Sequence, residues 1–335
     1  MRAIPEPALP PPLSPDPPAF APQVAIVIVS YRSQADVAAC LAALEQSTWA
    51  KFHIVICENG GTAAWEAARR HLPAALGSGQ KVDILQAPGN LGYAGGINFA
   101  IAKTPPADAY WILNPDTRPM PDALQALLER LRRGDCAAIG HDLVDEDGKL
   151  GSRGGQWLAW SARAISVDKG KPRRNDSDAA RLEASMDYIV GASMLVSRQF
   201  LQRVGPMRED YFLYCEEVEW CLRAVRRGER LGYTPDAVVV HAQGTSTGGG
   251  GGLSTRSKTS VYLAERARIL LTRDLYPARL PVAALLMLLH VLIRYGKVGA
   301  WRQMSYAISG WQAGLRNERG KPGWLETSDT AGAGA

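Results

Sequence analysis

The chain has 335 residues, of which 46% are hydrophobic and 21% are charged, and its formal net charge is +5. These values predict an ordinary globular protein with one large domain or slightly more. Lys and Arg form no compact block, which argues against a nucleic-acid-binding surface, whereas an anionic membrane or a phosphate-bearing substrate would suit the charge. The five cysteines are dispersed without a Cys-x-x-Cys pair, which argues against a disulfide framework or a structural zinc site and favours the cytosol.

The first 22 residues contain nine prolines, from Pro5 to Pro22. A secretory signal peptide needs an uninterrupted apolar stretch, and these prolines interrupt any such stretch. We therefore interpret residues 1–22 as a disordered, partly extended leader rather than as a signal peptide.

Short apolar runs alternate with helical patterns over the next part of the chain. Residues 24–29, 53–57, 82–85 and 110–113 are rich in Val, Ile and Leu, as is typical of strands that are buried on both faces. Helical spacing of apolar residues lies between these runs, and one of the helices is expected to begin near Ile97. The alternation predicts right-handed strand–helix–strand units and a doubly wound α/β sheet. Farther along, residues 142–148 are expected to form a polar hairpin.

Polar or glycine-rich segments follow these predicted strands. They begin with Ser30 and Tyr31, Glu58, Asn90, and Asn114 with Asp116. In an open α/β sheet, ligands bind at the carboxyl ends of the strands, so this pattern predicts a nucleotide cleft. An acidic residue there, such as Asp116, can hold a divalent cation, and the cation can hold a diphosphate.

Two adjacent carboxylates, Glu216 and Glu217, stand at the apparent start of a helix and are flanked by aromatic residues. The helix dipole tolerates negative charge there, and the aromatic residues would exclude water and raise a carboxyl pKa toward a value useful for a general base. The plainer interpretation is a helix start with Glu219 and Arg223 as an ion pair four residues apart. These residues alone favour the plainer interpretation.

His241 ends a predicted strand and precedes a hydroxyl-rich turn and a glycine run at residues 248–252. The histidine is either a structural side chain or a metal ligand, and the glycine run predicts a flexible loop. The chain lacks G-x-G-x-x-G, G-x-x-x-x-G-K-[ST], G-x-S-x-G and H-E-x-x-H. Dinucleotide-binding, P-loop, serine-hydrolase and zinc-protease sites are therefore not predicted.

The last part of the chain is predicted to be helical. Residues 283–293 are strongly apolar, but this run is shorter than the roughly 20 residues that a bilayer requires. Arg294 and Lys297 follow it, and Trp301 lies nearby. This pattern predicts a helix that lies in a membrane interface rather than across the membrane.

Taken in order, these segments resemble the family 2 glycosyltransferases, which are inverting enzymes of the GT-A fold, and most closely the bacterial rhamnosyltransferase-like branch. The resemblance covers about residues 24–250 and continues more loosely to about 323. The matching segments are residues 27–31, 58–60, 90–98, 113–117, 214–223 and 241–247. The resemblance implies a doubly wound, Rossmann-like mixed sheet with a helical C-terminal extension.

The resemblance also implies roles for individual residues. Ser30, Tyr31 and Glu58 would line the nucleoside pocket. Asn90, Gly95, Gly96 and Asn114 would lie along the diphosphate and sugar. Asp116 ends a D-x-D-like motif and would coordinate Mg²⁺ or Mn²⁺, with His241 as a second ligand. Glu217 would be the catalytic base, with Glu216 as the competing candidate. The family usually has Asp where this chain has Glu58, Glu217 and Glu219, which keeps the charge and lengthens each side chain by one methylene.

The function that the resemblance implies is metal-dependent, inverting transfer of a sugar, such as rhamnose from a dTDP donor, to a polysaccharide or lipid-linked glycan. We expect the enzyme in the cytoplasm, peripheral on the inner face of the cell membrane. One alternative is a nucleotidyltransferase, although Arg32 is the only basic residue near the first strand. Another is a catalytically silent module that binds nucleotide sugars.

We predict five segments along the chain. They are the leader at residues 1–22, a GT-A domain at 23–247, a flexible active-site loop at 248–258, a helical and membrane-associating extension at 259–323, and a disordered tail at 324–335.

Overall fold

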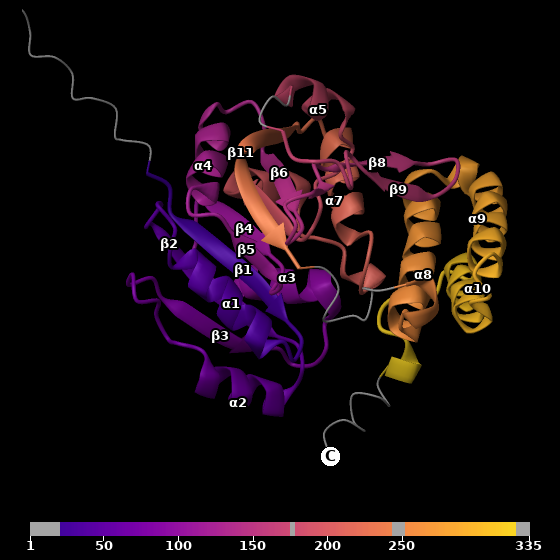
Figure 1. Ribbon diagram of the computed structural model, residues 1–335, viewed down its shortest axis with the longest axis horizontal. Coiled ribbons are helices and arrows are strands. Elements are labelled where there is room, and N and C mark those ends of the chain that lie inside the picture. Colours follow the sequence, from indigo (N-terminus) through magenta and orange to yellow (C-terminus); the bar gives the residue numbers. More distant parts are fainter. Residues whose placement is uncertain (1–20, 175–177, 243–251, 326–335) are drawn as a thin grey trace, which may run out of the picture.

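The computed structural model describes residues 21–174, 178–242 and 252–325 (Figure 1). The leader through residue 20, the glycines from 248 to 251 and the tail beyond 325 lie outside the described residues. The described part is a mixed β-sheet with helices on both faces and three further helices at one side. This arrangement confirms the predicted α/β class with a helical C-terminal extension.

The main sheet has nine strands, and eight of them follow the spatial order β3-β2-β1-β4-β10-β6-β11-β5, with β7 paired to β6. Strands β1 to β4 are mutually parallel, and β10 is antiparallel to both β4 and β6. A separate hairpin is formed by β8 (Gly155–Leu158) and β9 (Arg163–Ser166). The strands of the main sheet are β1 (Val24–Ser30), β2 (Phe52–Glu58), β3 (Val82–Gln86), β4 (Ala109–Leu113), β5 (Thr117–Pro119), β6 (Ala138–Val144), β7 (Leu150–Ser152), β10 (Ser193–Ser197) and β11 (Leu231–His241).

Burial of the strands on both faces explains their continuous apolar sequence. Along β1, Val24, Ile26 and Ile28 pack in one hydrophobic cluster, whereas the intervening residues pack in the other. Helices α1 (Gln34–Leu44), α2 (Thr62–His71) and α4 (Ala123–Arg132) cover the first face. Helices α3 (Gly92–Lys103), α6 (Arg198–Val204) and α7 (Glu216–Arg226) cover the second, and the short α5 (Ala179–Ser185) contacts β11.

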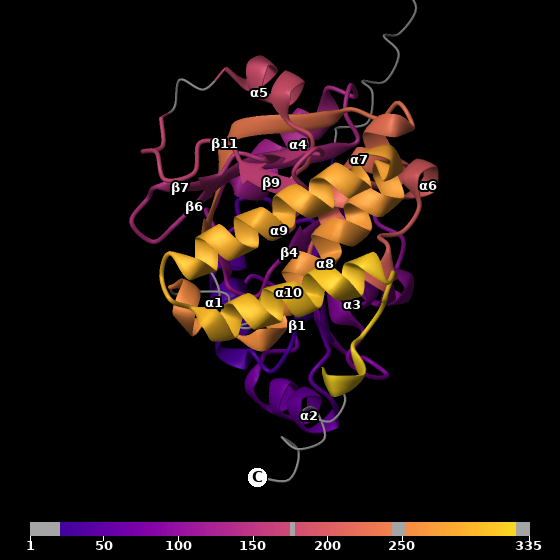
Figure 2. The same cartoon turned by 90° about the vertical axis from the view of Figure 1, so that its right-hand side faces the viewer.

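The C-terminal extension consists of α8 (Lys258–Leu275), α9 (Leu280–Gly296) and α10 (Trp301–Leu315), which lie side by side (Figure 2). Gly310 and Gly314 let α10 approach α8 closely, because a Cβ on Gly310 would lie 2.2 Å from the carbonyl oxygen of Tyr262. Beyond α10, Trp324 packs edge-on against Tyr262, and Leu325 is buried beside it. Both residues fall within the segment that we predicted as a tail.

Three local predictions differ from the structure. Helix α3 begins at Gly92 rather than near Ile97. Asp142, predicted in a polar hairpin, lies inside β6 and is fully buried, because Arg153 and Arg173 approach its carboxylate at 3.0 and 2.9 Å and pair its charge. The apolar C-terminal helix is also longer than predicted: with the turn that precedes it, Pro277–Gly296 has 20 residues and is long and apolar enough to cross a membrane.

Candidate active site

The carboxyl ends of β1, β4 and β11 meet at one edge of the sheet. Because β10 is antiparallel to both of its neighbours, β6 and its parallel partner β11 run in the same direction as β4. A cavity of about 700 Å³ opens at this edge. Its lining combines residues that follow the strands with residues from α3, α7, the start of α8 and the C-terminal segment: Val29, Tyr31, Asn59, Asn90, Gly92, Tyr93, Asn114, Pro115, Asp116, Val190, Gly191, Ala192, Phe212, Leu213, Tyr214, Glu216, Glu217, His241, Ser257, Thr259 and Leu325.

Asp116 and His241 meet in this cavity although 125 residues separate them. The short strand β5 pairs antiparallel with the end of β11, which places Thr117 opposite His241. The amide of Ala242 donates a hydrogen bond to the carbonyl oxygen of Asp116. This register brings the two side chains together, and the imidazole Nε2 of His241 lies 3.3 Å from the carboxylate Oδ1 of Asp116.

A carboxylate and an imidazole suit a divalent cation that takes its remaining ligands from a diphosphate. Asp116 is 7% exposed, so its oxygens face the cavity from a largely buried position. Over the described residues, no group of three or more His, Cys, Asp or Glu side chains could hold a metal ion without such help. The donor set of Asp116 and His241 fits a cation that would take its remaining ligands from a substrate.

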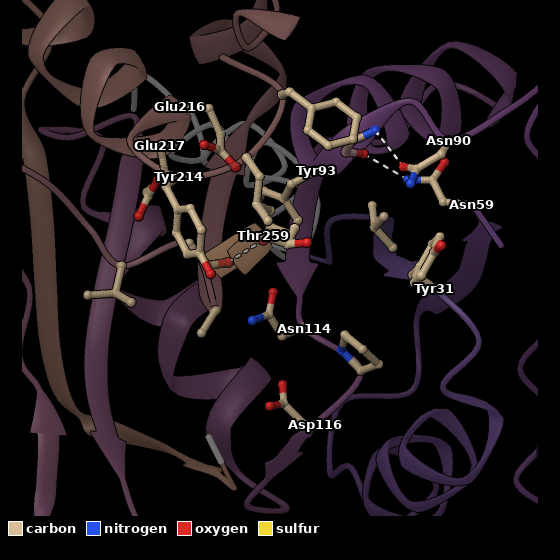
Figure 3. Close-up of a pocket in the computed structure, with 18 of the residues that line it drawn as sticks. Tyr31, Asn59, Asn90, Tyr93, Asn114, Asp116, Tyr214, Glu216, Glu217 and Thr259 are labelled. Carbon is tan, nitrogen blue, oxygen red and sulfur yellow. Dashed lines mark hydrogen bonds between the residues drawn. The ribbon is translucent and has the colours of Figure 1, made fainter. Parts of the chain in front are cut away.

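Glu216 and Glu217 begin α7, as predicted, and both line the cavity (Figure 3). The turn before them is unusual, because Phe212, Tyr214 and Cys215 all have positive φ angles, which non-glycine residues seldom adopt. Backbone of this kind persists only where the surrounding packing fixes it. Here it directs the helix N-terminus and both carboxylates toward the cavity.

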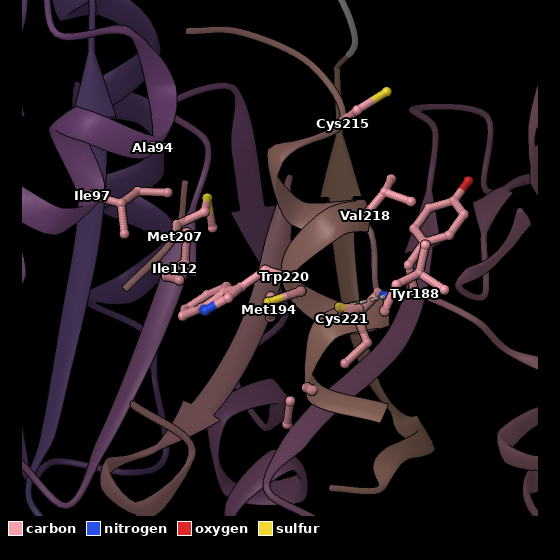
Figure 4. Close-up of a cluster of buried hydrophobic side chains, with 14 of the residues drawn as sticks. Ala94, Ile97, Ile112, Tyr188, Met194, Met207, Cys215, Val218, Trp220 and Cys221 are labelled. Atoms are coloured by element: carbon pink, nitrogen blue, oxygen red, sulfur yellow. Dashed lines mark hydrogen bonds between the residues drawn. The ribbon is translucent and has the colours of Figure 1, made fainter. Parts of the chain in front are cut away.

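Buried packing fixes the rest of α7. Trp220 is fully buried among apolar side chains (Figure 4). It contacts Phe200 edge-on at 4.8 Å between ring centroids and donates its indole N–H to the carbonyl oxygen of Gly205. Cys221 accepts a hydrogen bond from the amide of Ile189, which holds the segment before β10 beside the helix. The predicted pair of Glu219 and Arg223 is present at 2.9 Å. The structure therefore confirms the plainer interpretation, a helix start with an ion pair. The ion pair and the acidic pair occupy different positions on one helix, so this result does not exclude a role for the acidic pair.

Both carboxyl groups of the acidic pair have raised pKa values. Burial raises the pKa of Glu216 well above its ordinary value, and the charge of Glu217 raises it further. Burial also raises the pKa of Glu217, but backbone N–H groups, including that of Gly191, donate to this carboxylate and oppose the rise. Glu216 is 2% exposed, and its Oε2 has no hydrogen-bond partner among the residues that the structure describes. The two carboxylates are thus adjacent in sequence but differ in environment.

The glycine-rich segment before α3 is held at the rim of the cavity by two asparagines. Asn59 donates a side-chain N–H to the carbonyl oxygen of Gly92 at 2.7 Å, and the Gly92 amide donates to Asn90 Oδ1 at 3.2 Å (Figure 3). Gly92 has a φ of +73°, and a Cβ there would lie 2.1 Å from the carbonyl oxygen of Phe212. Only glycine fits this position.

Four of the predicted site residues lie behind the cavity and not in its lining. Glu58 is fully buried and accepts hydrogen bonds from the Ser30 hydroxyl at 2.6 Å and from the amides of Arg32 and Gly60. The carboxylate of Glu58 therefore shapes the two loops beside Tyr31. Gly95 and Gly96 are buried within α3, where a Cβ on Gly96 would lie 2.7 Å from Val29. Tyr31, Asn90, Asn114, Asp116, Glu216, Glu217 and His241 do line the cavity.

The structure adds cavity residues that we did not predict as site residues. Asn59 and Tyr93 belong to motifs noted in the sequence, and Tyr93 donates its hydroxyl to the carbonyl oxygen of Gly191 at 2.5 Å. Gly191 itself lies under Glu217, since a Cβ there would be 3.3 Å from that side chain. Thr259 comes from the C-terminal extension, and Leu325 comes from the segment after α10. No sequence pattern predicts that these two parts of the chain reach the cavity.

Comparisons with known proteins agree on one family. Residues 22–268 match the family described as Glycosyltransferase like family 2. The chain is 29% identical over 264 residues to an N-acetylglucosaminyl-diphospho-decaprenol L-rhamnosyltransferase of Mycobacterium tuberculosis, covering 72% of this chain and 84% of that protein. It is also 22% identical to the low-salt glycan biosynthesis hexosyltransferase Agl10 of Haloferax volcanii, covering 89% and 93% of the two chains.

Solved structures support the same fold. The mannosyltransferase PcManGT of Pyrobaculum calidifontis, in complex with GDP-Man and Mn²⁺, is similar with a TM-score of 0.53 and 14% identity over 90% of this chain and 89% of that one. GalNAc-T7 with UDP, GalNAc and Mn²⁺ is similar with a TM-score of 0.57 and 13% identity over 76% of this chain and 48% of that one. These likenesses confirm the predicted GT-A fold.

Proposed function

Since this chain belongs to the family 2-like glycosyltransferases and transfers a sugar from a nucleotide-sugar donor, we propose that it does so by a metal-dependent, inverting mechanism. The family assignment sets aside the nucleotidyltransferase alternative. We further propose rhamnose from dTDP-rhamnose as the transferred sugar, because the relative from Mycobacterium tuberculosis is named as a rhamnosyltransferase.

One observation supports the mechanism above all others: the acidic pair and the Asp116–His241 pair line the same cavity. In the view of Figure 3, Asn114 lies between Asp116 and the acidic pair. Such a cavity has a cation-binding group at one place and a proton acceptor at another. Direct displacement at a sugar carbon needs both, with the leaving group and the attacking oxygen on opposite faces of that carbon.

Glu217 is the proposed base. It accepts the proton of the acceptor hydroxyl while that oxygen forms a bond to the anomeric carbon of the donor. The bond from this carbon to the diphosphate oxygen breaks, and its electron pair departs with the nucleoside diphosphate. One displacement inverts the configuration of the carbon.

Asp116 and His241 are the residues that would hold Mg²⁺ or Mn²⁺. A cation bound there would neutralise the negative charge that develops on the departing diphosphate. The imidazole favours Mn²⁺ over Mg²⁺, since Mg²⁺ prefers oxygen ligands. Tyr31, Asn59 and Asn90 are the proposed contacts for the nucleoside and diphosphate, since all three line the cavity. Glu58 supports this role indirectly, because it accepts hydrogen bonds from Ser30 and Arg32 on either side of Tyr31.

We propose a polysaccharide or lipid-linked glycan as the acceptor, since the rhamnosyltransferase relative is named for a diphospho-decaprenol acceptor. Residues 23–247 form the proposed catalytic domain, and residues 259–323 form the extension that completes its cavity through Thr259. The cytoplasmic face of the cell membrane is the proposed place of action, because such an acceptor is embedded in lipid.

The test is release of nucleoside diphosphate from a panel of nucleotide sugars, measured with Mn²⁺, Mg²⁺ or chelator and with or without membrane lipid extract. We expect release from one donor, stimulated by lipid extract and abolished by chelator. Asp116→Ala should lower the rate by a factor on the order of 10² or more, because charge on the leaving group is no longer neutralised. Asp122→Ala is the matched control, since Asp122 is exposed and lies outside the cavity lining.

Two outcomes would contradict the proposal. Undiminished release in the presence of chelator would remove the metal from the mechanism. Saturable nucleotide-sugar binding without release from any donor would leave a catalytically silent binding module. The configuration of the product, determined by NMR, tests inversion separately.

A further inference from the structure

Exposed apolar side chains gather in one region of the molecule. Within the described residues, thirteen large hydrophobic side chains are exposed, and eleven of them belong to the β8–β9 hairpin, to α9, to the turn between α9 and α10 or to the start of α10. The other two are Met120 and Val225. We call these eleven residues the apolar face: Leu158, Trp160, Ile165, Val282, Leu285, Leu286, Leu289, Leu292, Ile293, Val298 and Trp301.

Helix α9 is apolar on both sides. One stripe, formed by Ala283, Ala284, Met287, Val291 and Tyr295, is buried. Between these positions, the exposed side chains of Leu285 to Ile293 are all large and apolar, and the two polar residues, His290 and Arg294, are partly buried. The outer side of a helix on a water-soluble surface is ordinarily polar. The outward side therefore suits an apolar environment.

The buried stripe determines how α9 meets that environment. Val291 and Tyr295 share a cluster with Ala307 of α10, and the Trp311 indole donates to the carbonyl oxygen of Ala284 at 3.0 Å. A helix that crossed a bilayer alone would lose these contacts, although Pro277–Gly296 is long enough to span one. The packing favours a helix that lies in the plane of the interface.

The β8–β9 hairpin extends the same face, although it is more than 100 residues away in sequence. The guanidinium of Arg279 lies 5.0 Å from the centre of the Trp160 ring. Arg268 of α8 donates a hydrogen bond to the carbonyl oxygen of Ala162 in the turn of the hairpin. In Figure 1 the hairpin reaches toward α9. Two separate elements thus contribute to one surface.

The charge along the helical part of this face is positive. Residues 275–317 contain no Asp or Glu and five basic residues, Arg279, Arg294, Lys297, Arg302 and Arg316. This segment alone accounts for a charge equal to the +5 of the whole chain. Trp160 and Trp301 are the aromatic members of the face, and tryptophan is typical of the boundary between lipid and water. Apolar residues flanked by cations complement an anionic lipid surface.

We propose that the apolar face binds the protein to an anionic phospholipid bilayer, with α9 lying in the membrane interface. The extension that bears the face also lines the cavity, through Ser257 and Thr259 at the start of α8. A sugar acceptor held by a lipid carrier would then meet the cavity at the membrane surface. This meeting of acceptor and cavity rests on the proposed lipid-linked acceptor, whereas binding of the protein to the membrane does not require such an acceptor.

The test is co-sedimentation of the full-length protein with vesicles of phosphatidylcholine alone or mixed with phosphatidylglycerol. We expect binding to the mixed vesicles, weakened by salt. The double variant Leu285→Gln/Leu289→Gln should partition at least roughly tenfold less, since two exposed apolar side chains are removed from the face. Met120→Gln/Val225→Gln is the matched control, because it removes the two exposed apolar side chains outside the face, and it should bind like the wild type.

The proposal is overturned if the wild type stays in the supernatant with mixed vesicles, or if the face variant binds as well as the control. It is also overturned if sedimentation shows a wild-type dimer that the face variant disrupts without any vesicle binding, since the face would then join two copies. Circular dichroism of each variant checks the fold. Vesicle binding is measured without donor, so failure to bind leaves the proposed transfer intact, and a failed transfer assay leaves the binding result intact.

Discussion

The acidic pair at the start of α7 shows how two identical side chains acquire different properties. Glu217 receives backbone hydrogen bonds that stabilise its charged form, whereas Glu216 is buried with one oxygen unpartnered among the described residues. The negative charge of Glu217 also contributes to the raised pKa of Glu216. The backbone hydrogen bonds favour the charged form of Glu217 over that of Glu216. An ionised carboxylate can accept a proton, which favours Glu217 as the base.

This difference predicts the effects of two matched substitutions. Glu217→Gln should lower kcat by a factor of about 10²–10⁴, because an amide cannot accept the acceptor proton. Glu216→Gln should keep most of the activity, since an amide resembles the neutral carboxyl that it replaces. Steady-state rates with saturating donor and acceptor measure both. The opposite ranking would assign the base to Glu216.

The pH profile provides a second readout of the same assignment. If Glu217 is the base, as we propose, transfer requires its ionised form, and burial raises the pKa of this group above the ordinary glutamate value of 4.5. Activity should therefore rise with pH through that raised pKa and be lost on acidification at a higher pH than an ordinary glutamate would give. Tyr93, Tyr188 and Cys215 lie near enough to sense the charge of Glu217, and burial raises the pKa of each of them, so they stay neutral over this range.

At the scale of elements, the start of α3 is joined to the turn before α7. The amide of Tyr93 donates to the carbonyl oxygen of Phe212 at 3.0 Å, and Gly92 lies against the same carbonyl. The segment proposed to bind the diphosphate and the turn that bears the base thus share one contact. A displacement at Gly92 would move both.

Gly92→Ala tests this connection. The added Cβ would overlap the Phe212 carbonyl in a backbone conformation that alanine disfavours. We therefore expect the free energy of unfolding to fall by about 1–3 kcal/mol and the transfer rate of the folded enzyme to fall as well. Gly89→Ala is the control, because a Cβ there meets nothing within 4 Å. Urea denaturation and initial rates measure the two effects. Equal behaviour of the variants would show that the contact is dispensable.

The elements also indicate what sequence reasoning can reach. Runs of Val, Ile and Leu predicted the parallel strands, and the residues that follow them predicted the edge at which the cavity opens. Asp116 and His241 come together because of the register between β5 and β11. The strand β5 has only three residues, so its sequence does not predict this register. Tyrosine and cysteine seldom adopt positive φ angles, so the sequence does not predict these angles at Tyr214 and Cys215. The family resemblance implies that Glu58 lines the nucleoside pocket, and the sequence does not reveal that its carboxylate accepts hydrogen bonds from the Ser30 hydroxyl and from the amides of Arg32 and Gly60.

At the scale of the whole molecule, an ionic cluster joins the C-terminal extension to the catalytic domain. Asp274, at the end of α8, accepts hydrogen bonds from Arg208 at 2.8 Å, from the Tyr211 hydroxyl at 2.7 Å and from Arg319 at 2.6 Å. Arg319 also contacts Asp210 at 2.7 Å. The cluster thus connects residues just before the α7 turn with the segment after α10, which reaches the cavity at Leu325.

Asp274→Asn should therefore weaken both stability and activity. The Asp274 side chain is only 13% exposed, and loss of its charge leaves Arg208 and Arg319 to share Asp210 as a carboxylate partner, so we expect about 2–3 kcal/mol of lost stability. Asp83→Asn is the matched control, since the Lys81–Asp83 pair is largely exposed and should contribute less than about 1 kcal/mol. Because the cluster holds the extension and not the donor site, the KM for acceptor should rise more than the KM for donor. If Asp274→Asn unfolds at the same denaturant concentration as Asp83→Asn, the extension is held by the apolar packing of α8 and α10 alone.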